Sequence, residues 1–556
     1  MSVINLLPKY RNLTSDEIDS LVRQGCTADD WDDILVDPDF NPDLVVRSSF
    51  HGRVCIGLGS VVRDARCYSH GRDIHVLSET GMRPVLVHPG LSPFTAYVQA
   101  FHAYRGEGLA RRLREAVELY ACPCVIDDGA VVDQATLRNC YVGPGVHIEE
   151  GFSAEESIFL YGSHLAKGEA CALLAGPFTV SHHKSTLLIA AATSFFNAGS
   201  GSNQSNHSYK LGPNKFGILE RGAKLGSSSY LFWPARVGAF STVLGHHMAH
   251  FDLHDLPFSY VIGEEGRSVV IPAVALQSIG TLRDEHKWKR RGAKALTPLT
   301  FCTLSPYTAG RIRAGIRLLE GLRQTEPAVL TTTLGVRHKY YRLGDCLIPT
   351  RAVEKGIDLY RDALLIYGVG MLCARIARRL PLTASDEATG PWLDYLGLVL
   401  PQQEATDAAL RAMDAAAPLG ALDDALRDLL ARLGDWEWNW VSRMLADEFG
   451  LTPAQADDET LRDAIGRYTF AVRHCRLLLH FDIDKEFNQE ASLLYGIDGT
   501  PDDARRDFDQ TIGSKEADPT CRMLDLIADV AIRTADRALA VLAEGLPEPP
   551  SPAERA

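Results

Sequence analysis

The chain has 556 residues, enough for three or four domains or for one long repetitive body with an appended domain. Hydrophobic residues make up 46% and charged residues 23%, the values of a globular protein with a large core, which excludes general disorder. The formal net charge of −14 argues against nonspecific binding to nucleic acid or to an anionic membrane surface.

Residues 1–49 are predicted to form a small helical cap. Thr14 and Glu17 have capping-box spacing before the apolar Ile18 and Leu21, and a second helix start is expected at Thr27. The N-terminus lacks a basic segment followed by a sustained apolar one, and no apolar run approaches the length that spans a bilayer. We therefore expect a cytoplasmic protein with no membrane partner.

From residue 50 the chain changes to short β-type segments separated by glycine, with a helical insertion expected at about 94–120. Cysteines are scattered, and only Cys122 and Cys124 lie close together. This spacing is not a zinc-binding CxxC…CxxC pattern and is typical of reduced thiols in the cytoplasm.

Residues 122–175 carry the most informative pattern. Ile126 and Val132 are six residues apart, as are Val142 and Ile148, while Leu137 lies five residues from each neighbouring position. A six-residue step with one aliphatic position is typical of a parallel β-helix, in which three hexapeptides make a coil of roughly 18 residues. An antiparallel β-sandwich is the alternative, since it also gives short strands with turn signals. The six-residue step favours a parallel β-helix over residues 50–300.

After Pro306, apolar residues recur at three- and four-residue spacing, which predicts an α-helical domain over residues 301–545. The segment 546–556 is predicted to be a disordered tail. Trp436, Trp438 and Trp440 are expected in the helical core rather than at an interface.

Histidines are enriched in the predicted β-helix. His164 and His182 are one coil of about 18 residues apart, which would place their rings about 5 Å from one another on adjacent coils. Such a pair could bind zinc or another divalent metal, with His246 and His250 as further candidate ligands, although the sequence has no HExxH motif. The alternative is that these are turn histidines bonded to nearby backbone.

The segment Gly199–Lys215 is predicted to be a substrate-binding loop, with His207 as general base and His247 as an alternative base. Amides and cations of this loop and of the nearby SHHKST segment would hold a polar, anionic ligand. The predicted substrate-binding residues are His182, His183, Lys184, Asn203, Asn206, Lys210 and Lys215. The alternative is a solvated insertion between two coils.

Several long segments resemble a known family. GPFTVSHHKSTLLIA, SFFNAGSGSNQSNHSYKLG, SSSYLFWPARVGAFSTVLG and LPFSYV are similar to an uncharacterised bacterial family of large cytoplasmic β-helix proteins with a C-terminal helical domain of unknown function. The resemblance implies a left-handed parallel β-helix of the hexapeptide-repeat, transferase-like type. It also implies a homo-oligomer, for which a trimer with sites between subunits is one form, but it supplies no reaction.

Three functions are open at this point. The first is an acyltransferase-like group transferase that takes an acyl-CoA-type donor and a polar small molecule, either phosphorylated or nucleotide-linked. The second is a metal-dependent enzyme with histidine ligands from adjacent coils. The third is a noncatalytic scaffold or ligand-binding protein.

Overall fold

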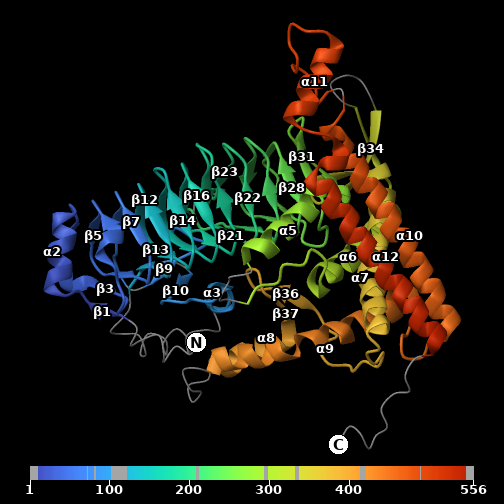
Figure 1. Cartoon of the computed structure of the whole chain (residues 1–556), viewed down its shortest axis with the longest axis horizontal. Helices are drawn as coiled ribbons and strands as arrows, with labels where there is room; N and C mark the ends of the chain where they lie inside the picture. The colour runs from blue at the N-terminus through green and yellow to red at the C-terminus, as the bar shows by residue number, and fades with distance from the viewer. Residues whose placement is uncertain are drawn as a thin grey trace, which may run out of the picture.

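The computed structural model describes residues 10–71, 73–80, 83–101, 122–207, 212–292, 298–331, 337–412, 421–488 and 490–545. A long parallel β-helix forms the N-terminal part, and helices gather at its C-terminal end (Figure 1). The predicted fold class, a parallel β-helix followed by a helical region, is confirmed.

The coils of the β-helix present three faces, which we name A, B and C, each a ladder of short strands from successive coils. Face A contains β3 (Ile34–Val36), β6 (Val54–Ile56), β11 (Cys124–Ile126), the second halves of β13 (Thr136–Val142) and β15 (Ser153–Phe159), β18 (Leu174–Ala175), β21 (Ala191–Thr193), β24 (Gly217–Leu219), β27 (Ala235–Val237) and β30 (Phe251–Asp252). Face B contains β4 (Val45–Val46), β7 (Val61–Arg63), β12 (Val131–Asp133), β14 (His147–Glu149), β16 (His164–Ala166), β19 (Val180–Ser181), β22 (Asn197–Ala198), β25 (Lys224–Leu225), β28 (Thr242–Leu244) and β31 (Tyr260–Glu264). Face C contains β2 (Thr27–Ala28), β5 (Ser49–His51), β8 (Arg66–Tyr68), the first halves of β13 and β15, β17 (Glu169–Cys171), β20 (Leu187–Ile189), β23 (Asn203–Ser205), β26 (Tyr230–Phe232) and β29 (His246–His247).

Inward side chains stack along the axis of the β-helix. On face B, Val132 pairs with Ile148 and Ile148 pairs with Leu165 on the next coil, and all three are fully buried. Because successive side chains of a strand point to opposite faces, the residues that flank each inward position point outward. The stacked inward column therefore decides which residues of face B meet solvent.

The β-helix begins earlier than residue 50. Helix α2 (Ser15–Arg23) starts with the predicted capping box, in which the backbone N–H of Glu17 donates to Oγ1 of Thr14. The second predicted helix, at Thr27, is instead strand β2, followed by the short 3-10 helix η2 (Trp31–Asp33). Strand pairing of β2 with β5 makes this segment part of the first coil.

A segment inserted after β8 covers the outer side of face A. It contains the antiparallel hairpin of β9 (Ile74–His75) and β10 (Pro84–Val85), and helix α3 (Pro93–Phe101). Their apolar side chains form a second core with outward residues of face A such as Val125 and Tyr141. The predicted helical insertion is confirmed as far as Phe101, and the rest of it lies outside the described residues.

The C-terminal end of the β-helix passes into the helical region through an antiparallel hairpin of β31 and β32 (Arg267–Ile271) and the 3-10 helix η4 (Val274–Gln277). The helices are α5 (Ile279–Gly292), α6 (Pro306–Arg323), α7 (Thr350–Ala377), α8 (Gln402–Ala412), α9 (Ala421–Phe449), α10 (Asp458–Ile483), α11 (Pro501–Thr511) and α12 (Pro519–Glu544), with short 3-10 turns η3 (Pro42–Leu44), η5 (Asp484–Glu486) and η6 (Lys515–Ala517) elsewhere. Figure 1 shows α7, α10 and α12 packed side by side across the end of the β-helix, in agreement with their contacts.

Strands also occur inside the region that was predicted to be entirely helical. They are β33 (Ala328–Thr331), β34 (Arg337–Leu343), β35 (Cys346–Pro349), β36 (Trp392–Asp394) and β37 (Val399–Pro401). Strand β35 pairs in parallel with β32, so the face B sheet continues into this region and joins it to the β-helix. The tail 546–556 lies outside the described residues. Trp436, Trp438 and Trp440 are buried, as predicted.

Among the helices of the described ranges, none combines the length and the apolar character that a membrane crossing requires.

Candidate metal centre on face B

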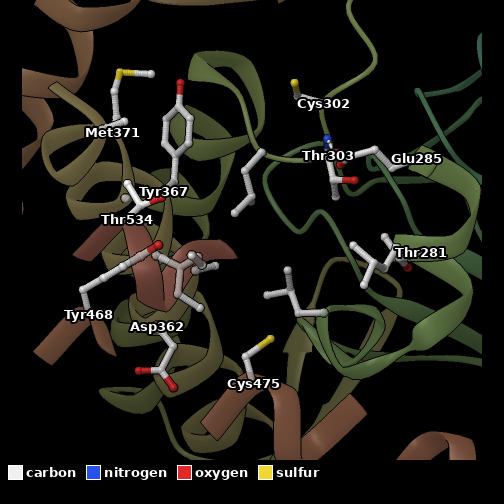
Figure 2. A pocket seen from close by; sticks show the side chains of 18 of the residues that line it. Thr281, Glu285, Cys302, Thr303, Asp362, Tyr367, Met371, Tyr468, Cys475 and Thr534 are labelled. Atoms are coloured by element: carbon white, nitrogen blue, oxygen red, sulfur yellow. Dashed lines mark hydrogen bonds between the residues drawn. The ribbon is translucent and has the colours of Figure 1, made fainter. Parts of the chain in front are cut away.

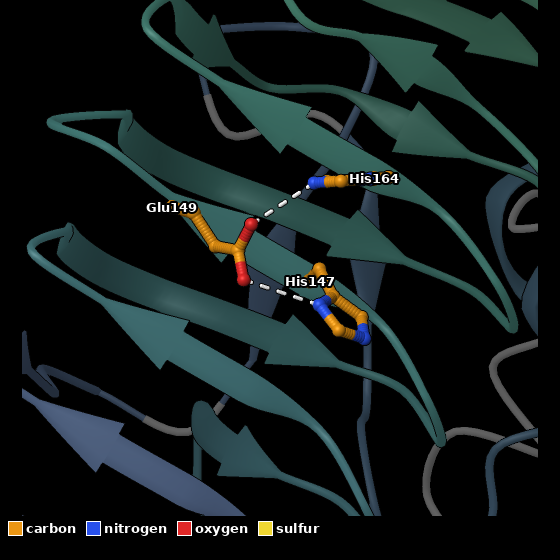
Figure 3. A group of neighbouring side chains, drawn as sticks. All are labelled: His147, Glu149 and His164. Carbon is orange, nitrogen blue, oxygen red and sulfur yellow. Dashed lines mark hydrogen bonds and ion pairs between the residues drawn. The ribbon is translucent and has the colours of Figure 1, made fainter.

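Three side chains from two adjacent coils meet on the outer side of face B: His147, Glu149 and His164 (Figure 3). Nδ1 of His147 lies 3.2 Å from Oε1 of Glu149, and Nε2 of His164 lies 3.0 Å from Oε2 of the same carboxylate. The ligand atoms of the three residues all lie within 4.8 Å of one another. Within the described ranges, this is the group of three histidine, cysteine or acidic side chains whose ligand atoms come within 4.8 Å of one another.

The register of the strands creates this cluster. Ile148 points inward, so His147 and Glu149 both point outward from β14. Parallel pairing then places His164 beside His147 and Ala166 beside Glu149. Because the side chain of Ala166 is short, the carboxylate of Glu149 has room to lean toward the ring of His164.

Two imidazole nitrogens and one carboxylate form a ligand set that binds zinc and other first-row transition metals. The exposed fractions of the side chains are 44% for His147, 27% for Glu149 and 37% for His164. The cluster is therefore held by the sheet on one side and open on the other. An open side is the feature that separates catalytic metal sites from closed structural ones.

The carboxyl group of Glu149 is kept in its charged form. Partial burial raises its pKa, but hydrogen bonds from His147 and His164 outweigh that effect and hold the pKa below its ordinary value. A carboxylate that stays ionised keeps its negative charge available to a cation at neutral pH.

His182 extends the histidine cluster by one coil. Its ring centroid lies 4.3 Å from that of His164 in an edge-on arrangement, and the ring centroids of His147 and His164 are 5.3 Å apart. The predicted approach of His164 and His182 on adjacent coils is thus confirmed. His147 and Glu149 were not predicted as ligands, although the inward position of Ile148 would have placed both on the outer side.

Helix α5 supplies positive charge beside this cluster. Nζ of Lys224, which lies on face B, forms an ion pair of 2.5 Å with Asp284 of α5. Partial desolvation lowers the pKa of His182, and the nearby charges of His164, His183, Lys287 and Arg291 lower it further. Lys287 and Arg291 follow Asp284 at three- and seven-residue spacing, so all three share one side of α5. Cationic side chains of α5 therefore lie near His182, at one end of the row of histidines.

The amide residues of the predicted substrate loop bond to nearby groups on face C. Nδ2 of Asn203 donates to the carbonyl oxygen of Gly201 at 2.9 Å, and Nδ2 of Asn206 donates to Oε1 of Glu79 at 3.1 Å. His207 is exposed at the end of this segment. Asn206 is fully buried, so its side chain is part of the packing between the loop and the inserted segment.

The remaining predicted binding residues do not gather around His207. His182, His183 and Lys184 are exposed and precede strand β20, whereas His207 follows the neighbouring strand β23. Because these strands run parallel, the two groups lie at opposite edges of face C. Lys215 is half-buried just before β24 of face A, and Lys210 lies outside the described residues.

The placement of His247 does not support its predicted role as a general base. It occupies an inward position of face C, equivalent to Gln204 and Leu231 on the preceding coils, and it is fully buried. Nδ1 lies 2.9 Å from Oγ of Ser268 and Nε2 lies 3.2 Å from the carbonyl oxygen of Leu244. Both ring nitrogens are thus engaged inside the β-helix, where they satisfy polar groups of the protein.

His246 and His250 take separate surroundings. His246 is exposed beside the ring of Tyr230, with centroids 5.9 Å apart, and His250 stacks on Phe232 with centroids 5.3 Å apart. Neither residue belongs to the three-residue cluster found within the described ranges. The metal-binding geometry lies on face B instead of at the predicted pair.

Comparison with known protein families gives two matches. Residues 10–66 and 122–323 match a family described as a domain of unknown function, DUF4954, and residues 374–535 match another domain of unknown function, DUF6819. The first match leaves out the inserted segment that covers face A and includes every residue of the face B cluster. A comparison with curated proteins finds no match. The chain is therefore similar to DUF4954 along its β-helix and to DUF6819 in its helical region.

Proposed function

We propose that the protein is a metal-dependent enzyme whose metal centre is held by His147, Glu149 and His164. The observation that carries this proposal is that two adjacent coils bring two imidazole nitrogens and an ionised carboxylate within 4.8 Å on an open surface. A bound transition metal would replace the direct contacts of Glu149 with the two rings and keep a position free for water.

The chemistry of such a centre is the activation of water. A divalent metal held by these three residues would supply that activation, because it would lower the pKa of a water bound to it. The protein holds the ligands on two rigid strands, which fixes their spacing through the backbone hydrogen bonds of the sheet. His182, which contacts His164 at its ring edge, orients the ligand rather than binding the metal.

The substrate that fits these surroundings is a small anionic molecule. Lys287 and Arg291 of α5 lie close enough to His182 to lower its pKa, and the exposed Lys184 follows in the same turn. Cations beside a metal centre favour a phosphate ester or a carboxylate, because they compensate the negative charge of the substrate and of the transition state.

The proposal is tested by loading the metal-free full-length protein with zinc, manganese or ferrous iron and measuring hydrolysis of the anionic ester 4-nitrophenyl phosphate. One of the metals is expected to bind with one ion per chain and to support turnover that a chelator abolishes. Glu149→Gln keeps the size of the side chain, removes its charge and is expected to lose both properties. Binding of no metal by the wild-type protein would refute the proposal.

Acyl-group transfer with His207 as general base is a second candidate. It is favoured by one observation: His207 is exposed beside Asn206, whose buried side-chain oxygen has no hydrogen-bond partner among the described residues. An oxygen that lacks a partner could accept a hydrogen bond from an acceptor substrate. If this candidate is correct, His207→Ala abolishes thioester consumption from acetyl-CoA by the full-length protein, whereas Glu149→Gln does not.

A further inference from the structure

A second site lies at the junction of the β-helix and the helical region, far along the chain from the face B cluster. A cavity of about 790 Å³ opens between η4 and α5 on one side and α7, α9, α10 and α12 on the other. Figure 2 shows Thr281, Glu285, Cys302 and Thr303 on one side, and side chains of α7, α10 and α12 on the other. Its volume falls in the range of small-molecule binding sites.

The walls of this cavity are mainly apolar. Leu282 of α5, Ile366 and Met371 of α7, and Leu478 of α10 contribute aliphatic or thioether surface from three different helices. Helix α5 is held against α10 by apolar packing and by a hydrogen bond from the backbone N–H of Ile279 to Oδ2 of Asp482. The cavity is thus built into the junction by fixed contacts on both sides.

Two of the three carboxylates that line the cavity have cationic or ring partners. Glu285 forms an ion pair of 2.5 Å with Lys289 and accepts a hydrogen bond from the backbone N–H of Thr303. Asp362 lies 3.3 Å from Nδ1 of His474. Each of these two carboxylates is therefore already paired with a group of the protein.

Glu437 is different. Its Oε1 accepts a hydrogen bond of 2.6 Å from the hydroxyl of Tyr367, and no ion pair joins it to a cation among the described residues. Burial raises the pKa of its carboxyl group, which reflects the cost of a negative charge that lacks a counter-charge in an apolar site. A cation brought into the cavity would remove that cost.

The arginines of the cavity are arranged differently from what a carboxylate ligand would need. The guanidinium of Arg375 stacks over the ring of Trp438 at 4.6 Å, and its Nε and terminal nitrogen donate to the carbonyl oxygen of Pro381. Two of its three guanidinium nitrogens therefore donate to the protein, while Glu437 forms no ion pair with a cation among the described residues. The other arginine of the lining, Arg378, is exposed to solvent, whereas Glu437 is half-buried, so a cation is favoured at Glu437 itself.

We propose that this cavity binds an amphiphilic amine, with its apolar body between η4, α5 and the helices and its ammonium group at Glu437. The apolar body would bury the aliphatic walls, and the ammonium group would form a charge-assisted hydrogen bond to the carboxylate. The hydroxyl of Tyr367 would hold the carboxylate in place.

The site contains its own reporter of occupancy. All twelve cysteines lie in the described residues, and Cys302, which lines the cavity, is the one that is exposed. The cavity walls partly desolvate the Cys302 thiol and raise its pKa, so its alkylation is slow and is best followed at mildly alkaline pH. A ligand in the cavity is expected to slow this reaction.

The test compares three probes of equal chain length, decylamine, decanol and decanoate, by titration calorimetry with the full-length protein. We expect decylamine to bind about tenfold more tightly than decanol and to protect Cys302 from iodoacetamide. Glu437→Gln keeps an acceptor for Tyr367 and is expected to remove the advantage of the amine while the affinity for decanol stays within about threefold.

Two controls make the result specific. Asp362→Asn removes another carboxylate of the same cavity and is expected to leave the preference for decylamine intact, and Cys302→Ser is expected to abolish the alkylation signal. Stronger binding of decanoate, an unchanged amine affinity in Glu437→Gln, or no binding of any of the three probes would overturn the proposal. None of these outcomes depends on the metal centre of face B.

Discussion

Replacing His164 by alanine is expected to destroy metal binding on face B while leaving the β-helix folded. His164 is the ligand that comes from the second coil, so the variant keeps only His147 and Glu149, both on β14. The side chain points outward and is 37% exposed, and its inward neighbour Leu165 is untouched. The change therefore removes a ligand without opening a cavity in the core.

The size of the effect follows from what the side chain does in the structure. Loss of a residue that only orients a ligand lowers metal affinity about 10- to 100-fold, and loss of a ligand itself is expected to cost at least the upper value. A factor of about 100 equals about 2.8 kcal/mol of binding free energy. His182 contacts the ring of His164 and is not a member of the ligand group, so His182→Ala is expected to cost about tenfold, the lower end of the range for an orienting residue.

The assay is competition between the full-length protein and a chromophoric zinc chelator, with circular dichroism to verify that each variant is folded. Equal losses of zinc affinity in His164→Ala and His182→Ala would show that His164 is not a specific ligand and that the histidines attract the metal without a defined site. Unchanged affinity in His164→Ala would refute the assignment of the ligands.

Three further predictions concern the frame that holds the sites. In denaturant titrations, Ile148→Ala is expected to lower the free energy of unfolding by about 2–5 kcal/mol and Ile148→Val by about 1 kcal/mol. The coils on either side fix the strand spacing, so the core cannot close around the space that the shorter side chain leaves. Equal losses in the two variants would contradict this. A hydrogen bond from Arg11 lowers the pKa of Glu17 to about 2. The stability that this pair gives α2 is therefore present above the unfolded pKa of about 4.5 and is lost as the pH falls toward 2. The expected loss is about 1–2 kcal/mol, because solvent screens the partly exposed Arg11. Hydrogen exchange of α2 should show this loss, and Glu17→Gln should show no such pH dependence. Asp394→Ala is expected to cost about 3–5 kcal/mol because it leaves the guanidinium of Arg221, which is 1% exposed, without its counter-charge; a thermal melt like that of the wild type would refute this.

The stacked β-helix could be predicted from the sequence because its inward positions must be apolar and recur at a fixed step. Ile126, Val132, Val142 and Ile148 obey that rule, and the structure confirms them as inward. The six-residue pattern of aliphatic residues cannot be followed in the later coils, because polar side chains occupy inward positions there. His247 is one of them, and its proximity to other histidines in the sequence suggested a site where the register places an internal packing residue.

The metal cluster, too, could be predicted from the sequence only in part. The approach of His164 and His182 was predictable from a coil length of about 18 residues, but coils differ in length, and His147 is paired with His164 only when the register is known. The cavity at the junction could not be predicted at all. Glu437 and Cys302 are far apart in the sequence and meet only because the helices pack against the end of the β-helix.

Anomalous X-ray diffraction from crystals of the full-length protein grown with zinc tests the central claim most directly. We predict one strong anomalous peak on face B, within bonding distance of Nδ1 of His147, Nε2 of His164 and a carboxylate oxygen of Glu149. A zinc peak elsewhere with none between these three side chains would contradict the account.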